Sequence, residues 1–350
     1  MDLEQKIEKS IKILRLAAKM SVEYYHAPLI VTYSGGKDSD VLLNLALDAG
    51  IQFEALNSHT TVDAQQSVYH IREVFADLEQ RGIKATIKMP TFKGKPTSMW
   101  KLIEEKGFPP TRTIRYCCQI LKEQTTPHRY IATGVRASES NARRNSSDFV
   151  IKGHTRKDAQ YFTYDRAAEA FGAEYPDFEV KPYGERYQQY TFNHALEVYD
   201  EAHEMPEEWD CNLIKAAKKQ KDLVCNPIIE WSDADVWKFI HERGIAYNPL
   251  YDMGYTRVGC IGCPLGGTKS MTREFEDFPK YKDAYIRAFE RMIEKRAAEG
   301  NPAKDSTGQE QFDWWIGNDK TPPGQMEIVQ GINGIEIKEH GKGDGDNVQM

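Results

Sequence analysis

The stretch Tyr33-Ser34-Gly35-Gly36-Lys37-Asp38-Ser39 decides the fold of this chain. It follows the apolar segment Leu29-Ile30-Val31-Thr32 and precedes an apolar-rich segment at 41–47, an order that predicts strand, glycine turn and helix. Two adjacent glycines allow a tight turn whose N–H groups approach an anion, and the helix N-terminus adds partial positive charge. Lys37 and two serine hydroxyls add further donors. The turn therefore predicts a phosphate-binding loop.

Two common phosphate-binding motifs do not match this loop. A Walker A motif requires Ser or Thr after the lysine and a glycine at position 31, but Asp38 follows Lys37 and position 31 is valine. The dinucleotide pattern Gly-x-Gly-x-x-Gly is also absent from this turn. The hexapeptide Ser-Gly-Gly-Lys-Asp-Ser resembles the PP-loop of ATP pyrophosphatases, which implies chemistry at the α-phosphate of ATP. The alternative is an ordinary strand–helix turn that contains two glycines.

The composition is ordinary for a soluble globular protein. The 350 residues are 40% apolar and 28% charged, and no apolar run approaches the length of a membrane span. The charged, amphipathic N-terminus does not resemble a secretory signal, so the six cysteines are expected to be reduced thiols or metal ligands. We expect a cytoplasmic location with no membrane association.

Alternating strand and helix patterns predict the fold class. Helices are expected over residues 3–25, 64–80 and 98–105, and strands over 51–56, 83–87 and 130–133. This alternation predicts an α/β fold with a Rossmann-like, doubly wound parallel sheet and helices on both faces. Ligands of such sheets bind at the carboxyl ends of strands, where Ser34, Asn57 and Gly134 are expected to lie.

The domain organisation is expected to have four parts. They are an N-terminal helix at 1–27, a nucleotide-binding α/β domain at 28–270, a C-terminal helical region at 271–330 and a disordered, glycine-rich tail at 331–350. An insertion at about 153–224 is crowded with Tyr and Phe, which predicts a small satellite core, with a substrate lid as the alternative. Ser232 is expected to cap a helix at 233–243, and a long helix is expected at 280–299.

A basic segment runs through the middle of a chain whose net charge is −7. Its basic residues are Arg129, Arg136, Arg143, Arg144, Lys152, Arg156 and Lys157. Such a patch is able to meet the phosphates of a nucleotide or of a polymer, but a solvated basic face explains it equally well.

The cysteines form a second constellation. Cys117 and Cys118 are adjacent, and Cys260-x-x-Cys263 places two thiols on one turn, so two pairs are available for a metal site. An adjacent Cys-Cys pair is unusual for structural zinc, and four unligated cysteines are the remaining alternative. Cys211 and Cys225 lack such a setting and are expected to be inert.

Several blocks, taken in order, carry a resemblance to a known family. They are 34–39, Arg115-Tyr116-Cys117-Cys118-x-x-Leu121-Lys122, Gly134-Val135-Arg136-x-x-Glu139-Ser140-x-x-Arg143, Pro227-Ile228-Ile229-x-Trp231-x-x-x-Asp235-Val236-Trp237, Asn248-Pro249-Leu250-Tyr251-Asp252-x-Gly254 and Arg257-x-Gly259-Cys260-x-x-Cys263-Pro264. Together they resemble the phosphoadenylyl-sulfate reductase family. The resemblance implies an adenine nucleotide alpha hydrolase-like fold with helical additions, and a [4Fe–4S] cluster on Cys117, Cys118, Cys260 and Cys263.

One departure from the family pattern affects the expected chemistry. Sulfonucleotide reductases use a C-terminal cysteine to attack the sulfur of the substrate, but this chain has no cysteine after Cys263. The stretch from Arg136 to Pro227 is also longer than in plain reductases. The resemblance is therefore closer to the DNA-phosphorothioation sulfurtransferase-like branch, in which ATP activates an acceptor for sulfur insertion.

The resemblance assigns expected roles to individual residues. The β- and γ-phosphates of ATP are expected on Ser34, Gly35, Gly36, Lys37 and Ser39. Asp38 is expected to orient the loop or Mg²⁺. Arg136 and Arg143 are candidates for stabilising charge at the α-phosphate, with Glu139 orienting them.

The adenosine is expected beside the end of the second strand. Asn57, His59 and Thr60 follow that strand, and Gly134 follows the neighbouring one. His59 is equally well explained as a surface-loop histidine.

The leading functional hypothesis is an ATP pyrophosphatase that adenylates an acceptor in a sulfur-transfer reaction. The acceptor is DNA, tRNA or a small molecule, and a sulfur-donor or thiol partner protein is expected. The first alternative is a phosphoadenosine phosphosulfate or adenylyl-sulfate reductase that uses an external thiol. The second is a nucleotide-switched subunit that binds nucleic acid through the basic segment.

Overall fold

A computed structural model describes most of the chain, namely residues 1–123, 126, 128–139, 143–144, 146–151, 189–204, 212–317, 326–331 and 334–339. The chain divides into two compact units, one made of Met1–Pro96 and Cys118–Gly259 and the other of Thr97–Cys117 and Cys260–Met350. This division into two units does not follow the expected four parts. The N-terminal helix belongs to the first unit, and residues 97–117 join the second because they pack on its helices.

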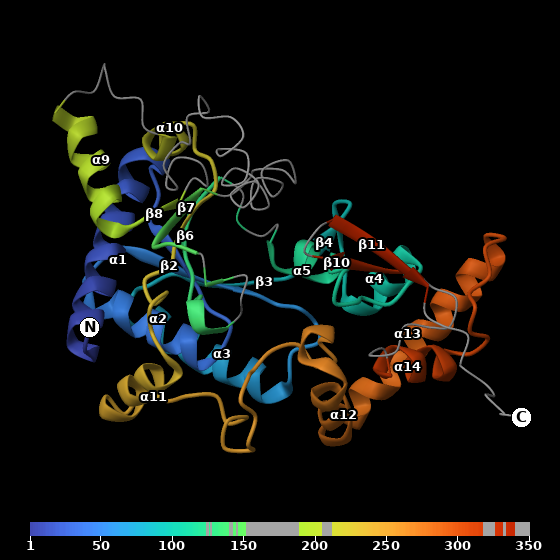
Figure 1. Cartoon of the computed structure of the whole chain (residues 1–350). Helices are drawn as coiled ribbons and strands as arrows, with labels where there is room; N and C mark the ends of the chain where they lie inside the picture. The colour runs from blue at the N-terminus through green and yellow to red at the C-terminus, as the bar shows by residue number, and fades with distance from the viewer. Residues whose placement is uncertain are drawn as a thin grey trace, which may run out of the picture. The chain divides into compact units, whose positions relative to one another are not determined.

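Figure 1 labels the elements of the described residues. The α-helices are α1 (Leu3–Tyr25), α2 (Lys37–Asp48), α3 (Gln65–Gln80), α4 (Met99–Lys106), α5 (Tyr116–Leu121), α9 (Phe192–Glu204), α10 (Asn212–Lys218), α11 (Asp233–Glu242), α12 (Gly267–Asp277), α13 (Pro279–Ala298) and α14 (Gly308–Ile316). The strands are β1 (Leu29–Thr32), β2 (Phe53–Ser58), β3 (Ala85–Lys88), β4 (Thr91–Phe92), β5 (Lys95–Pro96), β6 (Tyr130–Ala132), β7 (Phe149–Ile151), β8 (Gln189–Tyr190), β9 (Leu223–Cys225), β10 (Met326–Gly331) and β11 (Gly334–Glu339). Short 3₁₀ turns lie at Ala137–Glu139 and Pro264–Gly266.

The first unit is built on a sheet of seven strands within the described residues, in the order β3-β2-β1-β6-β9-β7-β8. The strands from β3 to β9 are parallel, with Val31 opposite Ala55 of β2 and Ala132 of β6. Strands β7 and β8 extend this sheet in antiparallel fashion. The predicted α/β class is therefore confirmed, as a mostly parallel sheet with flanking helices.

The strand order reverses at β1. The chain moves from β1 to β2 and β3 on one side and later adds β6 and β9 on the other. In parallel sheets this reversal opens a crevice beyond the carboxyl ends of the two central strands. The phosphate loop follows β1 and Gly134 follows β6, so both lie at this switch point.

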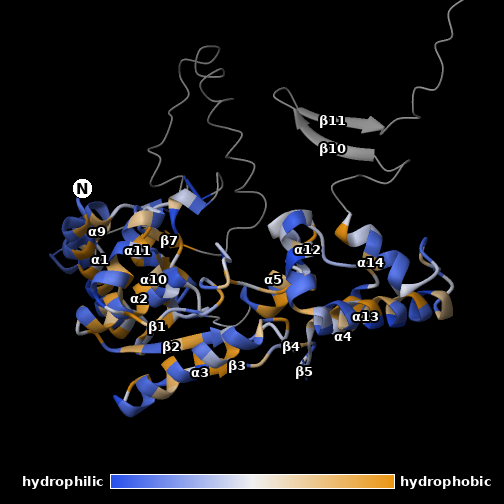
Figure 2. Cartoon of the chain, turned by 90° about the horizontal axis from the view of Figure 1, so that it is seen from below, coloured by the Kyte–Doolittle hydropathy of each residue, from blue (hydrophilic) through white to orange (hydrophobic). Residues whose placement is uncertain are grey.

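The core of the first unit covers one face of the sheet. Alternate residues Leu29 and Val31 of β1 point into it, together with buried side chains of α1, α2 and α3. Ile30 points to the opposite face and packs with Ile131 and Val224. Figure 2 shows this pattern as hydrophobic colour on the central strands and hydrophilic colour along the outer faces of the helices.

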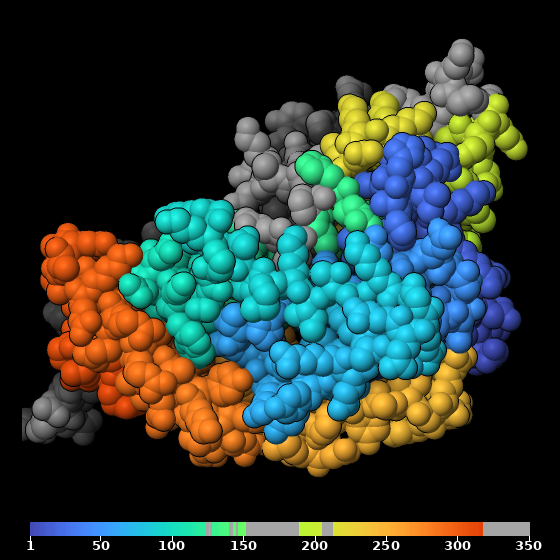
Figure 3. Space-filling view, turned by 180° about the vertical axis from the view of Figure 1, so that it is seen from behind, coloured from blue at the N-terminus to red at the C-terminus, as the bar shows by residue number. Residues whose placement is uncertain are grey.

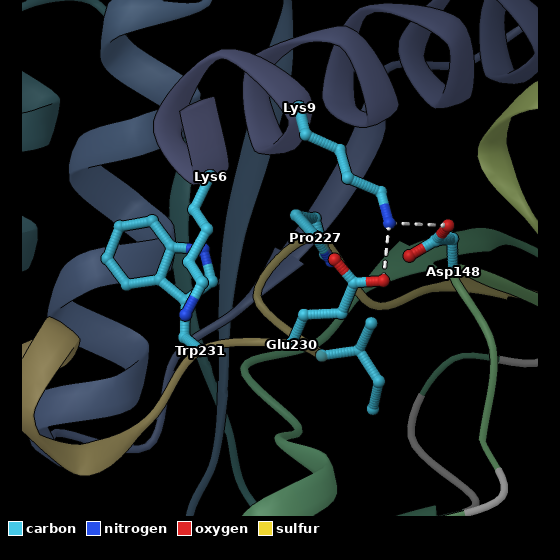
Figure 4. Close-up of a pocket in the computed structure, with 7 residues that line it drawn as sticks. Lys6, Lys9, Asp148, Pro227, Glu230 and Trp231 are labelled. Atoms are coloured by element: carbon cyan, nitrogen blue, oxygen red, sulfur yellow. Dashed lines mark ion pairs between the residues drawn. The ribbon is translucent and has the colours of Figure 1, made fainter. Parts of the chain in front are cut away.

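Ion pairs tie α1 to the sheet edge (Figure 4). Lys9 Nζ lies 2.8 Å from Glu230 Oε1 and 3.3 Å from Asp148 Oδ2, in a shallow crevice beside Trp231. The Trp231 indole N–H donates to the Ser10 hydroxyl at 3.1 Å. These contacts explain why the N-terminal helix is part of the nucleotide-binding unit rather than a separate segment.

Two expectations about the later chain were wrong in part. The predicted satellite core of the insertion is not separate where it is described, because Tyr190, α9 and α10 pack into the main core. Residues 152–188 and 205–211 of the insertion lie outside the described residues. In the predicted disordered tail, β11 pairs with β10 as an antiparallel hairpin, and residues 340–350 lie outside the described part.

The second unit is helical and has an aromatic core. Helices α4, α13 and α14 pack together, and Tyr285, Phe289, Phe312 and Trp315 are almost fully buried in it. The Trp315 indole donates to the Pro110 carbonyl at 2.7 Å, which holds the 97–117 segment on this unit. No helix among the described residues is long and apolar enough to cross a membrane.

Candidate phosphate-binding site

The phosphate loop joins β1 to α2 through a bend that requires glycine. Gly35 has a φ of +73°, and a Cβ there would lie 2.8 Å from the Ile71 side chain. Gly36 is the N-cap residue of α2, so the first N–H groups of that helix face the end of the sheet. Ser39 Oγ accepts from the Gly36 N–H at 3.1 Å and donates to its carbonyl at 2.7 Å. Ser34 is exposed at the mouth of the bend.

Lys37 and Arg136 form a buried pair of cations at this loop. Their side chains are 6% and 5% exposed. Asp38 lies between them, with Oδ1 at 2.6 Å from Arg136 Nε and Oδ2 at 3.6 Å from Lys37 Nζ. The second carboxylate is that of Asp233, the first residue of α11, which is 61% exposed. Two cations thus face two carboxylates, and the cluster is close to neutral.

Burial raises the pKa of Asp38, and the neighbouring charges of Lys37 and Arg136 oppose this effect. The carboxylate therefore depends on its two cations to stay ionised. A bound phosphate that draws Lys37 or Arg136 away would make protonation of Asp38 easier.

Tyr251 closes the loop from the segment after α11. Its hydroxyl accepts from the Lys37 N–H at 3.0 Å, and its ring lies 5.5 Å from Lys37 Nζ. Burial raises the pKa of this phenol well above its usual range, so Tyr251 stays neutral at physiological pH. Figure 3 shows the surface where this segment and α3 lie side by side, which agrees with the hydrogen bond from Asn248 to Ser67.

The predicted arginine segment lies at the end of β6. A Cβ on Gly134 would be 3.0 Å from the Asp38 carbonyl oxygen, so the two loops of the switch point approach each other closely. The Arg136 N–H donates to Glu139 Oε2 at 3.3 Å, and Arg143 pairs with the same carboxylate oxygen. Glu139 thus contacts both predicted arginines, while Arg143 remains largely exposed.

The residues predicted beside the adenosine are engaged within the fold. Asn57 is buried and donates to the Tyr33 carbonyl at 2.8 Å. His59 Nδ1 lies 3.4 Å from Asp63 Oδ2, and the Thr60 N–H donates to the same oxygen at 2.8 Å. These contacts shape the turn after β2. Strand β2 pairs with β1, and the phosphate loop follows β1.

A buried polar network lies beneath the loop. The Tyr33 hydroxyl donates to Asp40 Oδ1 and lies 2.9 Å from His70 Nε2, which is 3.1 Å from the same carboxylate oxygen. All three side chains are at most 5% exposed. The network links β1, α2 and α3 directly under the anion loop.

Three residues of the site carried no predicted role. Asn248 and Tyr251 belong to a block that resembles the family, so a signal existed, but their contacts depend on tertiary structure. Asp233 was visible only as the residue after the helix cap Ser232, and nothing in its local sequence indicates a contact with Lys37.

The predicted basic patch is only partly described. Arg129 lies 3.7 Å from Glu54 Oε1, Arg136 pairs with Asp38 and Arg143 pairs with Glu139. Acidic partners therefore reduce the free positive charge of these three residues. Lys152, Arg156 and Lys157 lie outside the described residues.

Cys117, Cys260 and Cys263 belong to the second unit, and the unit boundary falls between Cys117 and Cys118. The three thiols of the second unit all lie close enough to Tyr285 to raise its pKa, after burial, which is the largest cause. The Tyr285 hydroxyl donates to the Ile261 carbonyl at 3.0 Å, between the two cysteines of the Cys-x-x-Cys turn.

The cysteine turn is tightly supported. Gly262 has a φ of +73°, and a Cβ there would lie 2.6 Å from the ring of Phe275. The Gly262 N–H donates to Glu274 Oε2 at 2.6 Å.

The cysteines Cys117, Cys118, Cys260 and Cys263 match in number and kind the four thiolate ligands of a [4Fe–4S] cluster. No three His, Cys, Asp or Glu side chains of the described chain are gathered so as to hold one metal ion. In a [4Fe–4S] cluster the four thiolates bind different irons, so they need not converge on one point. The metal site therefore stays a prediction. Cys225 is buried in β9 and Cys211 lies outside the described residues.

Comparison with known proteins assigns the chain to a family. The model of the phosphoadenosine phosphosulfate reductase domain matches residues 28–265, which is more than half of the chain. The chain belongs to this family. The matched phosphoadenosine phosphosulfate reductase domain includes the phosphate loop, Arg136 and Tyr251, and also Cys117, Cys118, Cys260 and Cys263.

Relatives of this phosphoadenosine phosphosulfate reductase-family chain are distant. Protein MJ0973 of Methanocaldococcus jannaschii is 22% identical over 292 residues, which are 83% of this chain and 54% of that protein. The adenosine 5'-phosphosulfate reductase of Anoxybacillus flavithermus is 39% identical over 51 residues, 15% of this chain and 22% of the enzyme. The chain thus spans about half the length of MJ0973 and about a fifth of the length of the Anoxybacillus enzyme.

Solved structures give weaker matches. The phosphoadenylyl-sulfate reductase of Candida auris, in a phosphate complex, is 15% identical and aligns over 74% of this chain and 93% of its own with a TM-score of 0.36. The fold assignment therefore rests on the sheet topology and the family match.

Proposed function

We propose that this chain is an ATP pyrophosphatase that adenylates an acceptor in a sulfur-transfer reaction. The observation that carries the proposal is the buried pair of Lys37 and Arg136 at the N-terminus of α2, beside a diglycine bend. Buried cations and helix N–H groups form a strong anion site because little water competes with the phosphate. Parallel sheets bind ligands at the strand-order reversal, so the nucleotide would lie beside this site.

In the proposed reaction an acceptor oxygen or nitrogen attacks the α-phosphorus of ATP. The new bond forms at phosphorus while the bond to the bridging oxygen breaks, and pyrophosphate leaves with that electron pair. The loop residues Ser34 to Ser39 would hold the β- and γ-phosphates, and Lys37 and Arg136 would offset the charge that grows on the leaving group. The acceptor proton passes to solvent or to the leaving pyrophosphate.

Mg²⁺ would be held mainly by phosphate oxygens, as is usual for nucleotide sites. Asp38 is the loop carboxylate that would add a ligand, since its oxygens lie beside the two cations that would contact phosphate in this proposal. Sulfur would come from a donor or thiol partner protein, and DNA or tRNA is the acceptor class we propose. A [4Fe–4S] cluster on Cys117, Cys118, Cys260 and Cys263 would supply sulfur or electron chemistry when bound.

The test is anaerobic purification with iron and sulfide analysis, followed by a screen for pyrophosphate release from ATP with nucleic-acid acceptors. We expect acceptor-dependent pyrophosphate, lost in Lys37→Ala. Iron and sulfide should be lost in Cys263→Ser and retained in the matched buried-cysteine variant Cys225→Ser. Absence of pyrophosphate with every acceptor, from protein that carries its cluster, would reject the proposal.

A reductase function is the second candidate, because the matching family model and the Anoxybacillus relative are both named for sulfonucleotide reductases. Sulfite release from an adenylyl sulfate in the presence of a dithiol protein would support it. The same purified protein serves both assays, so the product identifies the reaction.

A further inference from the structure

Two buried asparagine amides hold alternate carbonyls of the phosphate loop. Asn57 Nδ2, in β2, donates to the Tyr33 carbonyl oxygen at 2.8 Å. Asn248 Nδ2, in the segment after α11, donates to the Gly35 carbonyl oxygen at 2.8 Å. The two side chains are 6% and 0% exposed, so water does not replace either bond.

These bonds determine where the loop N–H groups point. A trans peptide directs its carbonyl and the following N–H in opposite directions. Holding the Gly35 carbonyl toward Asn248 therefore turns the Gly36 N–H away from it, and holding the Tyr33 carbonyl does the same for Ser34. A Gly-Gly peptide has little conformational preference of its own, so its direction depends on its two partners. Ser39 Oγ accepts from the Gly36 N–H at 3.1 Å within the loop, and Asn248 holds the Gly35 carbonyl from outside it.

The turn that carries Asn248 holds the loop at a second point. Asn248 Oδ1 accepts from the Leu250 N–H at 3.1 Å, which closes a turn that ends at Tyr251. The Tyr251 hydroxyl accepts from the Lys37 N–H at 3.0 Å. The turn therefore bonds to the loop on both sides of Gly36, at the Gly35 carbonyl and at the Lys37 N–H. More than two hundred residues separate the two segments in the sequence.

A third contact anchors the turn itself. Asn248 Nδ2 also donates to Ser67 Oγ at 3.0 Å, on the first turn of α3. All the donor and acceptor groups of the Asn248 amide are thus used within the fold, and none of them is left to contact a ligand.

We propose that Asn248 is a positioning residue that sets the direction of the loop N–H groups before phosphate binds, with Asn57 as its counterpart at the preceding carbonyl. The inference rests on the proposed phosphate binding at this loop. Asn248 acts through the Gly35–Gly36 peptide rather than by touching phosphate. Removing its donor leaves the Gly35 carbonyl buried without a partner, which favours rotation of this peptide.

The test compares Asn248→Ala and Asn248→Asp with the wild type. The aspartate keeps the shape and the acceptor for Leu250 but lacks the donor for Gly35. Calorimetry with pyrophosphate should show binding weaker by about tenfold or more in both variants. Amide hydrogen exchange of Gly36 and Lys37, measured without ligand, should be faster than in the wild type.

Asn226→Asp is the matched control. Asn226 is 3% exposed, donates to the Ser147 carbonyl at 2.9 Å and accepts from the Thr133 hydroxyl at 2.6 Å, but makes no bond to the loop. Its variant should lose thermal stability while pyrophosphate affinity stays within about threefold of the wild type.

The two arms separate this inference from the proposed function. The positioning role is overturned if Asn248→Asp keeps the pyrophosphate affinity and the amide hydrogen exchange of the wild type. It is also overturned if Asn226→Asp loses as much pyrophosphate affinity as Asn248→Asp. If the wild type binds no pyrophosphate, the proposed function fails, and the exchange arm still decides whether Asn248 orders the loop.

Discussion

Lys37 Nζ and Asp233 Oδ1 lie 3.1 Å apart, and the same oxygen lies 3.0 Å from the Arg136 guanidinium. One exposed carboxylate therefore sits against two buried cations. A phosphate that binds these cations must compete with Asp233, because the phosphate, Asp233 and Asp38 all need the same donors. The exposed position of Asp233 at the start of α11 makes it the easier carboxylate to displace.

Removing this competing charge should strengthen phosphate binding. We expect Asp233→Asn to bind metal-free pyrophosphate about threefold to tenfold more tightly, since an amide competes less well for the cations. Calorimetry at low salt measures the effect. Asp77→Asn, at a comparably exposed ion pair on α3, is the control and should bind like the wild type. Weaker binding in Asp233→Asn would instead make the carboxylate part of the phosphate site.

Removing the loop cation should weaken phosphate binding. Lys37→Ala is expected to lose about tenfold to a hundredfold in pyrophosphate affinity, because a charge-assisted bond to phosphate is lost from a buried site. A calorimetric titration with pyrophosphate measures this loss. Lys84→Ala removes an exposed lysine that pairs with Glu54 and should bind normally. Equal affinities of the two variants would place the phosphate elsewhere.

The close approach at Gly134 should not tolerate a methyl group. Gly134→Ala places a Cβ 3.0 Å from the Asp38 carbonyl oxygen and 3.1 Å from its carbon, both of which are backbone atoms. We expect a loss of about 1–3 kcal/mol in the free energy of unfolding and weaker pyrophosphate binding, since the loop must shift. Gly259→Ala meets no atom within 4 Å and serves as the control. Urea unfolding that fails to distinguish the two would contradict this packing.

Stability should depend on pH through Asp235. Burial acts to raise the pKa of this carboxyl, but hydrogen bonds from Lys6 and Ser232 outweigh it and lower the pKa to about 2. Because the pKa is lower in the folded state, the contribution is present above the unfolded value and is lost as pH falls through about 2. Asp235→Asn should cost about 1 kcal/mol at pH 7 after allowance for solvent screening, and less below about pH 4.

Urea unfolding between pH 7 and pH 3 measures this dependence. Lys6→Met removes the partner of the same ion pair, 2.6 Å away, and should show a similar convergence with the wild type at low pH. A difference for Asp235→Asn that stays constant across this range would mean that the carboxylate charge does not contribute to stability.

Local sequence was sufficient for the elements with strong periodic patterns. Helices α1, α3, α4, α11 and α13 lie within a few residues of their predicted ranges. Ser232 caps α11 as predicted, with its side chain accepting from the Asp235 N–H. The strands around the phosphate loop were also predicted, because short β-branched runs bounded by glycine turns carry their own signal.

The insertion was the least predictable part. Its described helices α9 and α10 were not foreseen, and their burial in the main core depends on partners far away in sequence. For example, the Tyr199 hydroxyl donates to Glu23 Oε2 of α1 at 2.5 Å. A crowd of aromatic residues signals packing but does not identify the surface on which it packs.

The sequence by itself determined that an anion loop follows the first strand and that this loop belongs to an α/β sheet, because glycine turns and apolar periodicity act over a few residues. Only the tertiary structure decided which distant groups complete the loop. Asp233, Asn248 and Tyr251 reach it from a segment about two hundred residues away, through single contacts of 2.8–3.1 Å. Such contacts depend on the register of the strands and the packing of α11 beside α2, which no local pattern encodes.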